Sequence, residues 1–92
     1  MNDIKTFTKT PLEKLKKLNP GGRVELLTFK RDRSVVIIKK DFDIYDVIED
    51  GFNNKVFENI KFDNLEKLLK NLKKIEFPRS NNYFLKIKKG SR

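Results

Sequence analysis

Residues 55–75, KVFENIKFDNLEKLLKNLKKI, carry the strongest structural signal in this chain. From residue 63 onwards, apolar residues recur every three or four positions, which is the spacing of one face of an α-helix. The residues on this face are Leu65, Leu68, Leu69, Leu72 and Ile75. Asp63 and Glu66 have the spacing of a capping box, so we expect a helix over 63–75 that begins at Asp63. The run before it, 55–62, is rich in β-branched and aromatic residues and predicts a strand.

The segments around this helix predict further elements. Residues 23–30 (RVELLTFK), 34–40 (SVVIIKK) and 82–89 (NYFLKIKK) predict strands, the first two joined in a hairpin. Thr10-Pro11-Leu12-Glu13 predicts the start of a short helix, with Thr10 as its cap. Asn19-Pro20-Gly21-Gly22 is expected to end this helix.

Residues 41–50, DFDIYDVIED, fit two structures equally well. Phe42 and Ile44 alternate with polar residues, as in a strand. Ile44, Val47 and Ile48 also fit a helix face, with Asp43 as cap and a stop at residue 51. The sequence leaves a bent strand and a short helix open.

The predicted fold class is α+β: an antiparallel sheet of about four strands, with one or two amphipathic helices packed on one face. A chain of 92 residues suits one domain. We expect a flexible N-terminus over 1–9, where no periodicity is present, and a single basic nucleic-acid-binding domain over 10–92. Neither a membrane span nor a signal peptide is evident, and nothing argues for export, so a cytoplasmic location is expected.

The composition favours binding over catalysis. The chain has 22 Lys and Arg against 13 Asp and Glu, a formal charge of +9, and it has no His, Cys or Trp. A small basic domain is typical of proteins that bind polyanions, of which nucleic acid is the commonest. The absence of His and Cys removes the usual general base, the usual nucleophile and most transition-metal ligands. We therefore expect no enzyme activity, no cofactor and no metal.

The charge is divided along the chain. Residues 1–40 and 51–92 each carry eleven basic and four acidic groups, whereas 41–50 carries five acidic groups and no basic one. An anionic ligand is expected to be attracted to the two basic segments and repelled from the acidic one. The acidic residues do not have the spacing of a known metal motif, so a small metal-dependent nuclease is only the third interpretation of function.

Basic and aromatic residues alternate in three places that we select as candidate sites. On the last strand, Phe84, Lys86 and Lys88 point to one side and Tyr83 points to the other. Cations that follow phosphates, with aromatic rings that stack on bases, are what single-stranded nucleic acid requires. The alternative is an edge strand that lysines protect against aggregation, with Phe84 in a small second core.

The second place is the hairpin turn, and the third is a polar loop near the C-terminus. Around the turn we select Phe29, Lys30, Arg31, Arg33, Lys39 and Lys40. In the loop we select Arg79 and Tyr83, which lie beside two asparagines at 81 and 82. Such groups grip phosphates or stack on bases. The alternatives are an ordinary solvated turn and a plain connecting loop.

The run NKVFENIKFDNLEKLLKNLKK, which follows two predicted antiparallel strands, resembles the single-stranded-DNA-binding coactivator family typified by transcriptional positive cofactor four. The likeness covers about residues 23–75. It implies a curved antiparallel sheet, a homodimer formed through helix 63–75, and ligand contacts at Phe29, Arg31, Arg33, Lys39 and Lys40. The chain departs from the family in its extra N-terminal helix, its acidic middle segment and its strand after the helix.

The sequence thus predicts non-enzymatic, largely sequence-independent binding of single-stranded nucleic acid, with DNA favoured slightly over RNA. The alternative is a protein-interaction module, or a dimeric regulatory or assembly subunit, that uses the acidic segment 41–50 as its contact. The expected partners are single-stranded DNA or RNA and a second copy of the chain, and no membrane.

Overall fold

The computed structural model describes residues 1–90. In chain order, the elements are β1 (Asn2–Asp3), a 3₁₀ turn η1 (Ile4–Thr6), α1 (Thr10–Lys17), β2 (Arg23–Leu27), β3 (Ser34–Asp41), β4 (Ile44–Asp50), β5 (Asn54–Ile60), α2 (Phe62–Glu76) and β6 (Asn82–Lys88). Residues 91–92, the end of the domain predicted over 10–92, lie outside the described residues.

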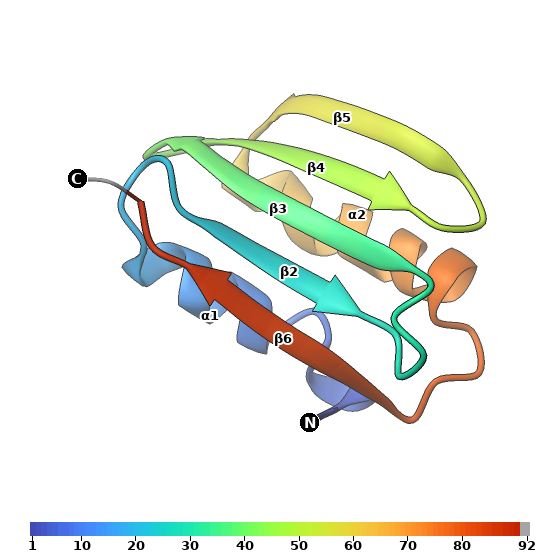
Figure 1. Ribbon diagram of the computed structural model, residues 1–92. Coiled ribbons are helices and arrows are strands. Elements are labelled where there is room, and N and C mark those ends of the chain that lie inside the picture. Colours follow the sequence, from blue (N-terminus) through green and yellow to red (C-terminus); the bar gives the residue numbers. More distant parts are fainter. Residues whose placement is uncertain (91–92) are drawn as a thin grey trace.

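The six strands form one antiparallel sheet in the order β1-β6-β2-β3-β4-β5. Both α-helices pack on the same face, and the other face is left open (Figure 1). The predicted α+β class is therefore confirmed. The prediction of about four strands was too low, because a two-residue strand pairs with β6 near the N-terminus and the ambiguous segment 41–50 supplies another full strand.

The acidic segment is the strand β4. Tyr45, Val47 and Glu49 alternate into the layer between sheet and helices, and all three are buried. Ile48 lies on the opposite face, directly across from Val36 of β3. A strand, whose side chains alternate between the two faces of the sheet, pairs with both neighbours, β3 and β5. This pairing decides for a strand over the short helix that the sequence also left open.

The hairpin turn is longer than its charged residues suggest. β2 ends at Leu27, because the Thr28 backbone N–H donates to the Arg33 carbonyl (3.1 Å) and the Arg31 N–H donates to the Thr28 carbonyl (2.9 Å). Arg31 has a positive φ of 59°. Residues 28–33 are thus held as a closed turn, and the strand expected over 23–30 is three residues shorter.

Neither helix begins with the cap that its sequence predicts. Thr10 is the first residue of α1, which has no side-chain cap. α2 begins at Phe62, one residue before Asp63, and again lacks a local side-chain cap. Instead, Oδ1 of Asp43, in the turn between β3 and β4, accepts the Phe62 backbone N–H at 3.0 Å.

The core lies between the helices and the sheet. Two leucines of α1, Leu18 directly after it and three leucines of α2 pack there against inward-facing residues of β2, β3 and β4. These residues are Leu12, Leu15, Leu18, Leu65, Leu69, Leu72, Val24, Leu26, Val35, Ile37, Tyr45 and Val47. The apolar stripe of α2 is thus used largely within the chain, although Ile75 stays 39% exposed. The homodimer through this helix stays a prediction.

The N-terminal segment lies against the end of β6. The Ile4 N–H donates to the Asn81 carbonyl at 2.9 Å. Phe7 is fully buried, and its ring centroid lies 4.7 Å from that of Phe77 and 5.3 Å from that of Tyr83. These tertiary contacts position a segment whose sequence has no periodicity of its own.

Candidate nucleic-acid interface

The open face of the sheet is where the predicted basic and aromatic residues meet. Residues directly opposite each other in an antiparallel sheet point to the same side. Phe84, Lys86 and Lys88 of β6 lie opposite Leu27, Glu25 and Arg23 of β2, respectively. We call Phe84, Lys86, Lys88 and Arg23 the basic band.

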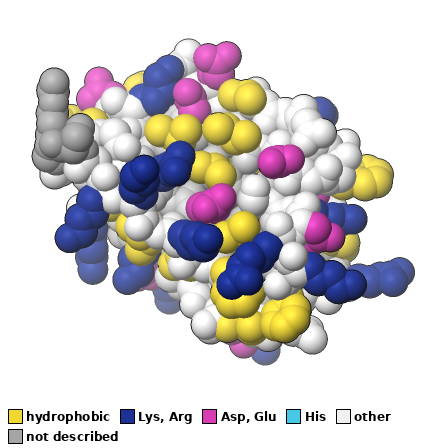
Figure 2. Space-filling model, viewed as in Figure 1, with side chains coloured by type: hydrophobic (Ala, Val, Ile, Leu, Met, Phe, Trp, Pro, Cys, Tyr) yellow, Lys and Arg dark blue, Asp and Glu magenta, His cyan; other side chains and the backbone are white. Residues whose placement is uncertain are grey.

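Two further bands follow across the same face. Next to the basic band lies an apolar band, made of Leu27, Val36, Ile38, Ile48 and Val56. Asp46 and Asp50 of β4 flank Ile48 along the strand, and we call these two aspartates the acidic band. Hydrophobic side chains gather across the middle of this face, with charged side chains between and around them (Figure 2). The open face therefore carries three cations around Glu25 on β2 and β6, and two aspartates on β4.

An aromatic cluster lies at the end of the basic band. The rings of Phe29 and Phe84 are stacked, with centroids 6.1 Å apart and planes 23° from parallel. The Arg31 guanidinium carbon lies 4.5 Å from the Phe84 ring centroid, which is a cation–π contact. Phe29 remains 66% exposed. The structure thus brings two residues selected from the hairpin turn together with one selected from the last strand.

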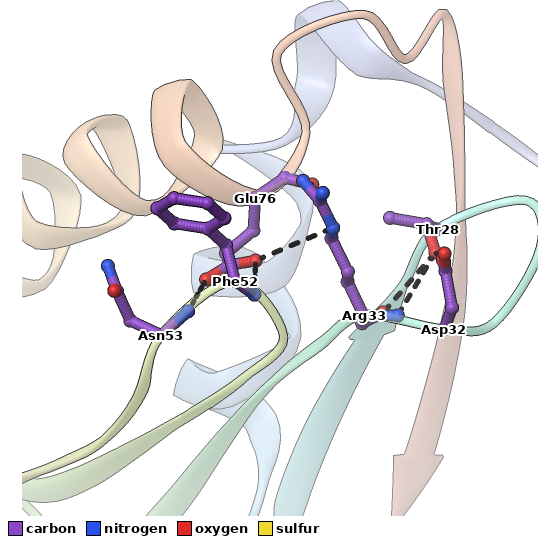
Figure 3. Close-up of polar contacts among 6 residues, drawn as sticks. All are labelled: Thr28, Asp32, Arg33, Phe52, Asn53 and Glu76. Atoms are coloured by element: carbon purple, nitrogen blue, oxygen red, sulfur yellow. Dashed lines mark hydrogen bonds and ion pairs between the residues drawn. The ribbon is translucent and has the colours of Figure 1, made fainter.

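The turn that carries Phe29 and Arg31 is held by Thr28. Its hydroxyl donates to the Asp32 carboxylate at 2.8 Å and accepts the Arg33 backbone N–H at 3.3 Å (Figure 3). The bond from Thr28 lowers the pKa of the Asp32 carboxyl. Because these bonds close the turn, it presents Phe29 and Arg31 in a fixed arrangement.

Several selected residues lie away from the basic band. Tyr83 is fully buried in the core, where its hydroxyl hydrogen-bonds to the Thr6 hydroxyl (2.8 Å). Lys39 is buried as well, and its ammonium donates to the Leu15 carbonyl at 3.0 Å. Lys40 lies on the open face beside the acidic band, with its ammonium 3.6 Å from the Asp46 carboxylate.

Arg33 turns away from the open face toward the end of α2. Its Nε lies 3.9 Å from Oε1 of Glu76, and its Nη1 donates to the Glu76 carbonyl at 3.4 Å. Lys30 and Arg79 lie nearby, on the wall of a groove between the turn 28–33 and the connection from α2 to β6. The eleven selected residues thus divide among the open face, this groove and the core.

Glu76, at the end of α2, binds the turn between β4 and β5. Its carboxylate is buried and accepts the backbone N–H groups of Phe52 (2.7 Å) and Asn53 (3.0 Å) (Figure 3). The carboxylate lies so close to Gly51 that a side chain there would clash with it. Glu76 therefore ties the turn between β4 and β5 to the end of α2.

A second carboxyl, Glu49, is buried beside Glu76. Burial, followed by the hydrogen bond to Glu76 and the charge of Glu76, raises the pKa of Glu49 to about 7. The pKa of Glu76 is lowered, because the Glu49 hydrogen bond, the two backbone N–H groups and Arg33 together outweigh its burial. Glu49 is thus the member of the pair that holds a proton, and its Oε2 has no hydrogen-bond partner among residues 1–90.

Sequence reasoning missed one member of the basic band and part of the groove. Arg23 lies opposite Lys88 and is exposed, yet it stands at the very start of a strand. The hairpin register would have placed it on the same side as Glu25. The groove also includes Ser80 and the Thr28 hydroxyl, which no local pattern marks.

Comparison with protein-family models, with curated proteins and with solved structures finds no match for this chain. Within the described part, no three His, Cys, Asp or Glu residues are grouped so that they could hold a metal ion. None of the helices over residues 1–90 is long and apolar enough to span a bilayer. The function is therefore inferred from the charge and geometry of the chain itself.

Proposed function

We propose that the chain binds single-stranded nucleic acid along the basic band of the open sheet face. The observation that carries this proposal is the Phe29–Phe84 stack, with Arg31 over Phe84, at the end of a strand that carries Lys86 and Lys88 on the same side. This arrangement supplies a surface on which bases stack and cations that contact phosphates.

The basic band also runs along β6, in an orientation that suits a nucleic-acid strand. Lys86 and Lys88 are two residues apart on β6, so their Cα atoms are about 7 Å apart along the strand. Asp46 and Asp50 lie on β4, two strands away from β2, and repel a polyanion from that part of the face. The nucleic acid is therefore expected to run along β6 and β2.

The test is fluorescence anisotropy of a labelled single-stranded oligonucleotide, with duplex as competitor, at a series of salt concentrations. If Arg23, Arg31, Lys86 and Lys88 each neutralise one phosphate, log K should fall with log salt with a slope of about −3. Binding that does not change with salt, or that prefers duplex, would contradict the proposal. Replacing Lys86 and Lys88 by Gln should reduce the slope by roughly 0.7 for each lysine.

A second candidate function is protein interaction through the apolar band. Val36, Ile38 and Ile48 are only half-buried, and Val56 is 61% exposed, on a face that carries charges of both signs. Grouped apolar residues on an open face are typical of interaction surfaces. Of the acidic segment 41–50, Asp46, Ile48 and Asp50 face this side, whereas Tyr45 is buried.

Replacing Asp46 and Asp50 by Asn separates the two candidates. Asn keeps an oxygen that accepts the Asn59 backbone N–H, as Asp46 does at 3.0 Å. A nucleic-acid interface should bind equally well or more tightly after this change, because the repulsion is removed. A large loss of oligonucleotide binding would contradict the nucleic-acid interface.

A further inference from the structure

A polar groove of about 570 Å³ opens at the end of the sheet, between the turn 28–33 and the connection from α2 to β6. Phe29 lines this groove and also stacks on Phe84 of the basic band. The groove is therefore continuous with the proposed nucleic-acid interface. Its volume falls within the range of small-molecule sites, roughly 300–1,000 Å³.

Both walls of the groove are held in place by hydrogen bonds. On one side, Thr28 closes the turn through Asp32 and Arg33. On the other side, the Ser80 N–H donates to the Phe77 carbonyl (3.3 Å), and the Asn81 carbonyl accepts the Ile4 N–H. The groove therefore needs little rearrangement to receive a ligand.

Three cationic side chains line the groove. Arg33 is fixed by Glu76, yet about a third of its side chain (34%) remains exposed. Its two contacts with Glu76 use only part of the five donors of a guanidinium. Lys30 and Arg79 add positive charge from the two facing walls. An anchored guanidinium with two flanking cations suits a phosphate group.

Asp32 and Glu76 also line the groove, with their carboxylates bound by the Thr28 hydroxyl and by the backbone N–H groups of residues 52 and 53, respectively. Three of the other lining groups suit a base. Phe29 offers an aromatic ring, and Asn81 and Asn82 offer side-chain amides on the opposite wall. An amide carries both donors and an acceptor, and therefore complements the edge of a nucleobase. Phosphate-binding and base-binding groups thus line one groove.

We propose that this groove is a nucleotide subsite: Arg33, Lys30 and Arg79 hold one phosphate, and Phe29 with Asn81 and Asn82 holds the attached base. The inference rests on the proposed function in one respect, because it assigns the groove to one nucleotide of the strand that follows the basic band. The ligand class is a nucleoside phosphate, free or as part of a single strand.

The experiment is a titration of the ¹⁵N-labelled full chain with AMP, adenosine and inorganic phosphate, followed by amide chemical shifts. AMP should shift amides over 28–33 and 79–82 and should bind more tightly than adenosine or phosphate alone. Arg79→Gln should weaken AMP binding roughly tenfold, because a charge-assisted hydrogen bond is lost. Lys74→Gln, at an exposed residue of α2 outside the groove, is the matched control and should bind AMP as the wild type does.

Oligonucleotide anisotropy on the same proteins separates this inference from the proposed function. Lys88→Gln should weaken oligonucleotide binding and leave AMP binding unchanged, whereas Arg79→Gln should weaken both. If oligonucleotides bind but AMP shifts no groove amide, or Arg79→Gln binds AMP normally, the subsite is overturned and the proposed function stands. Inorganic phosphate binding as tightly as AMP would overturn the assignment of a base. AMP binding in the groove without any oligonucleotide binding would overturn the proposed function and leave a site for free nucleotides.

Discussion

The Asp43 carboxylate accepts the backbone N–H of Phe62 at 3.0 Å, so a residue nineteen positions away in the sequence caps the first turn of α2. Lys61 lies beside this cap, with its ammonium 3.9 Å from the other Asp43 oxygen. A carboxylate at a helix N-terminus also interacts favourably with the helix dipole. The turn between β3 and β4 therefore fixes where α2 begins.

Replacing Asp43 by Ala should lower the free energy of unfolding by about 1 kcal/mol, because the cap is lost. Asp63→Ala, at the position that the sequence predicts as the cap, should cost only a few tenths of a kcal/mol, since Asp63 lies inside the helix and contributes mainly through the dipole. Urea denaturation of both variants at neutral pH measures the difference. Equal losses, or a larger loss for Asp63→Ala, would contradict the cap seen in the structure.

This cap illustrates how far local patterns reach. The apolar spacing of 63–75 predicted α2 because the helix buries Leu65, Leu69 and Leu72 of that spacing. The capping residue could not be predicted from the same stretch, since it comes from a turn that only the β3–β4 pairing brings near. The segment 41–50 was ambiguous for a similar reason: its strand is selected by neighbours on both sides.

The candidate interface was predictable in part. Alternation along 82–89 placed Phe84, Lys86 and Lys88 on one side, as the structure has them. Lys39 has the same local character as Lys40, yet it points into the core toward the end of α1. A run of charges does not reveal which long side chain reaches a buried carbonyl, because that depends on the packing of a distant helix.

The buried pair Glu49 and Glu76 makes stability depend on pH near neutrality. The pKa of Glu49 is raised from 4.5 to about 7 in the folded chain, so the folded state holds this proton more tightly than the unfolded state does. The stability that protonation contributes is present below pH 4.5 and is lost as the pH rises to about 7. The slope should approach about 1.4 kcal/mol per pH unit within that window. Urea denaturation between pH 5 and pH 8 measures it.

Glu49→Gln is the variant that identifies this group. The amide is neutral at every pH and can still donate to Glu76, so the decline between pH 5 and 7 should disappear. The pKa of Glu76 is lowered, and its contribution is therefore lost only in acid, outside this window. Lys55 and Arg33 act on the pair through their charges, which lower the pKa of Glu49 and of Glu76, respectively. A wild type whose stability is level from pH 5 to pH 8 would disprove the assignment.

Lys39 and Lys40 are neighbours with opposite expected effects. Lys39→Ala should destabilise the chain by about 1–3 kcal/mol, because it removes a buried stem and a charged hydrogen bond to the Leu15 carbonyl. Lys40→Ala should lower the free energy of unfolding by less than about 1 kcal/mol, since the ion pair that it removes, with Asp46, is partly exposed. Thermal or urea unfolding compares them. If Lys39→Ala is as stable as the wild type, its contact with α1 contributes nothing.

The aromatic cluster should contribute to oligonucleotide affinity through stacking. Phe84→Ala and Phe29→Ala should each weaken binding of a single-stranded oligonucleotide by about 1–3 kcal/mol, measured as anisotropy at fixed salt. The salt slope should stay unchanged, because no cation is removed. Phe52→Ala is the matched control: this ring is 72% exposed in the turn between β4 and β5, away from the basic band. The Phe52→Ala variant should bind as the wild type does.

Phe29→Leu keeps apolar bulk without an aromatic face and should behave like Phe29→Ala. If Phe29→Leu binds like the wild type, the ring contributes packing and not stacking, and the interface would depend on its cations alone.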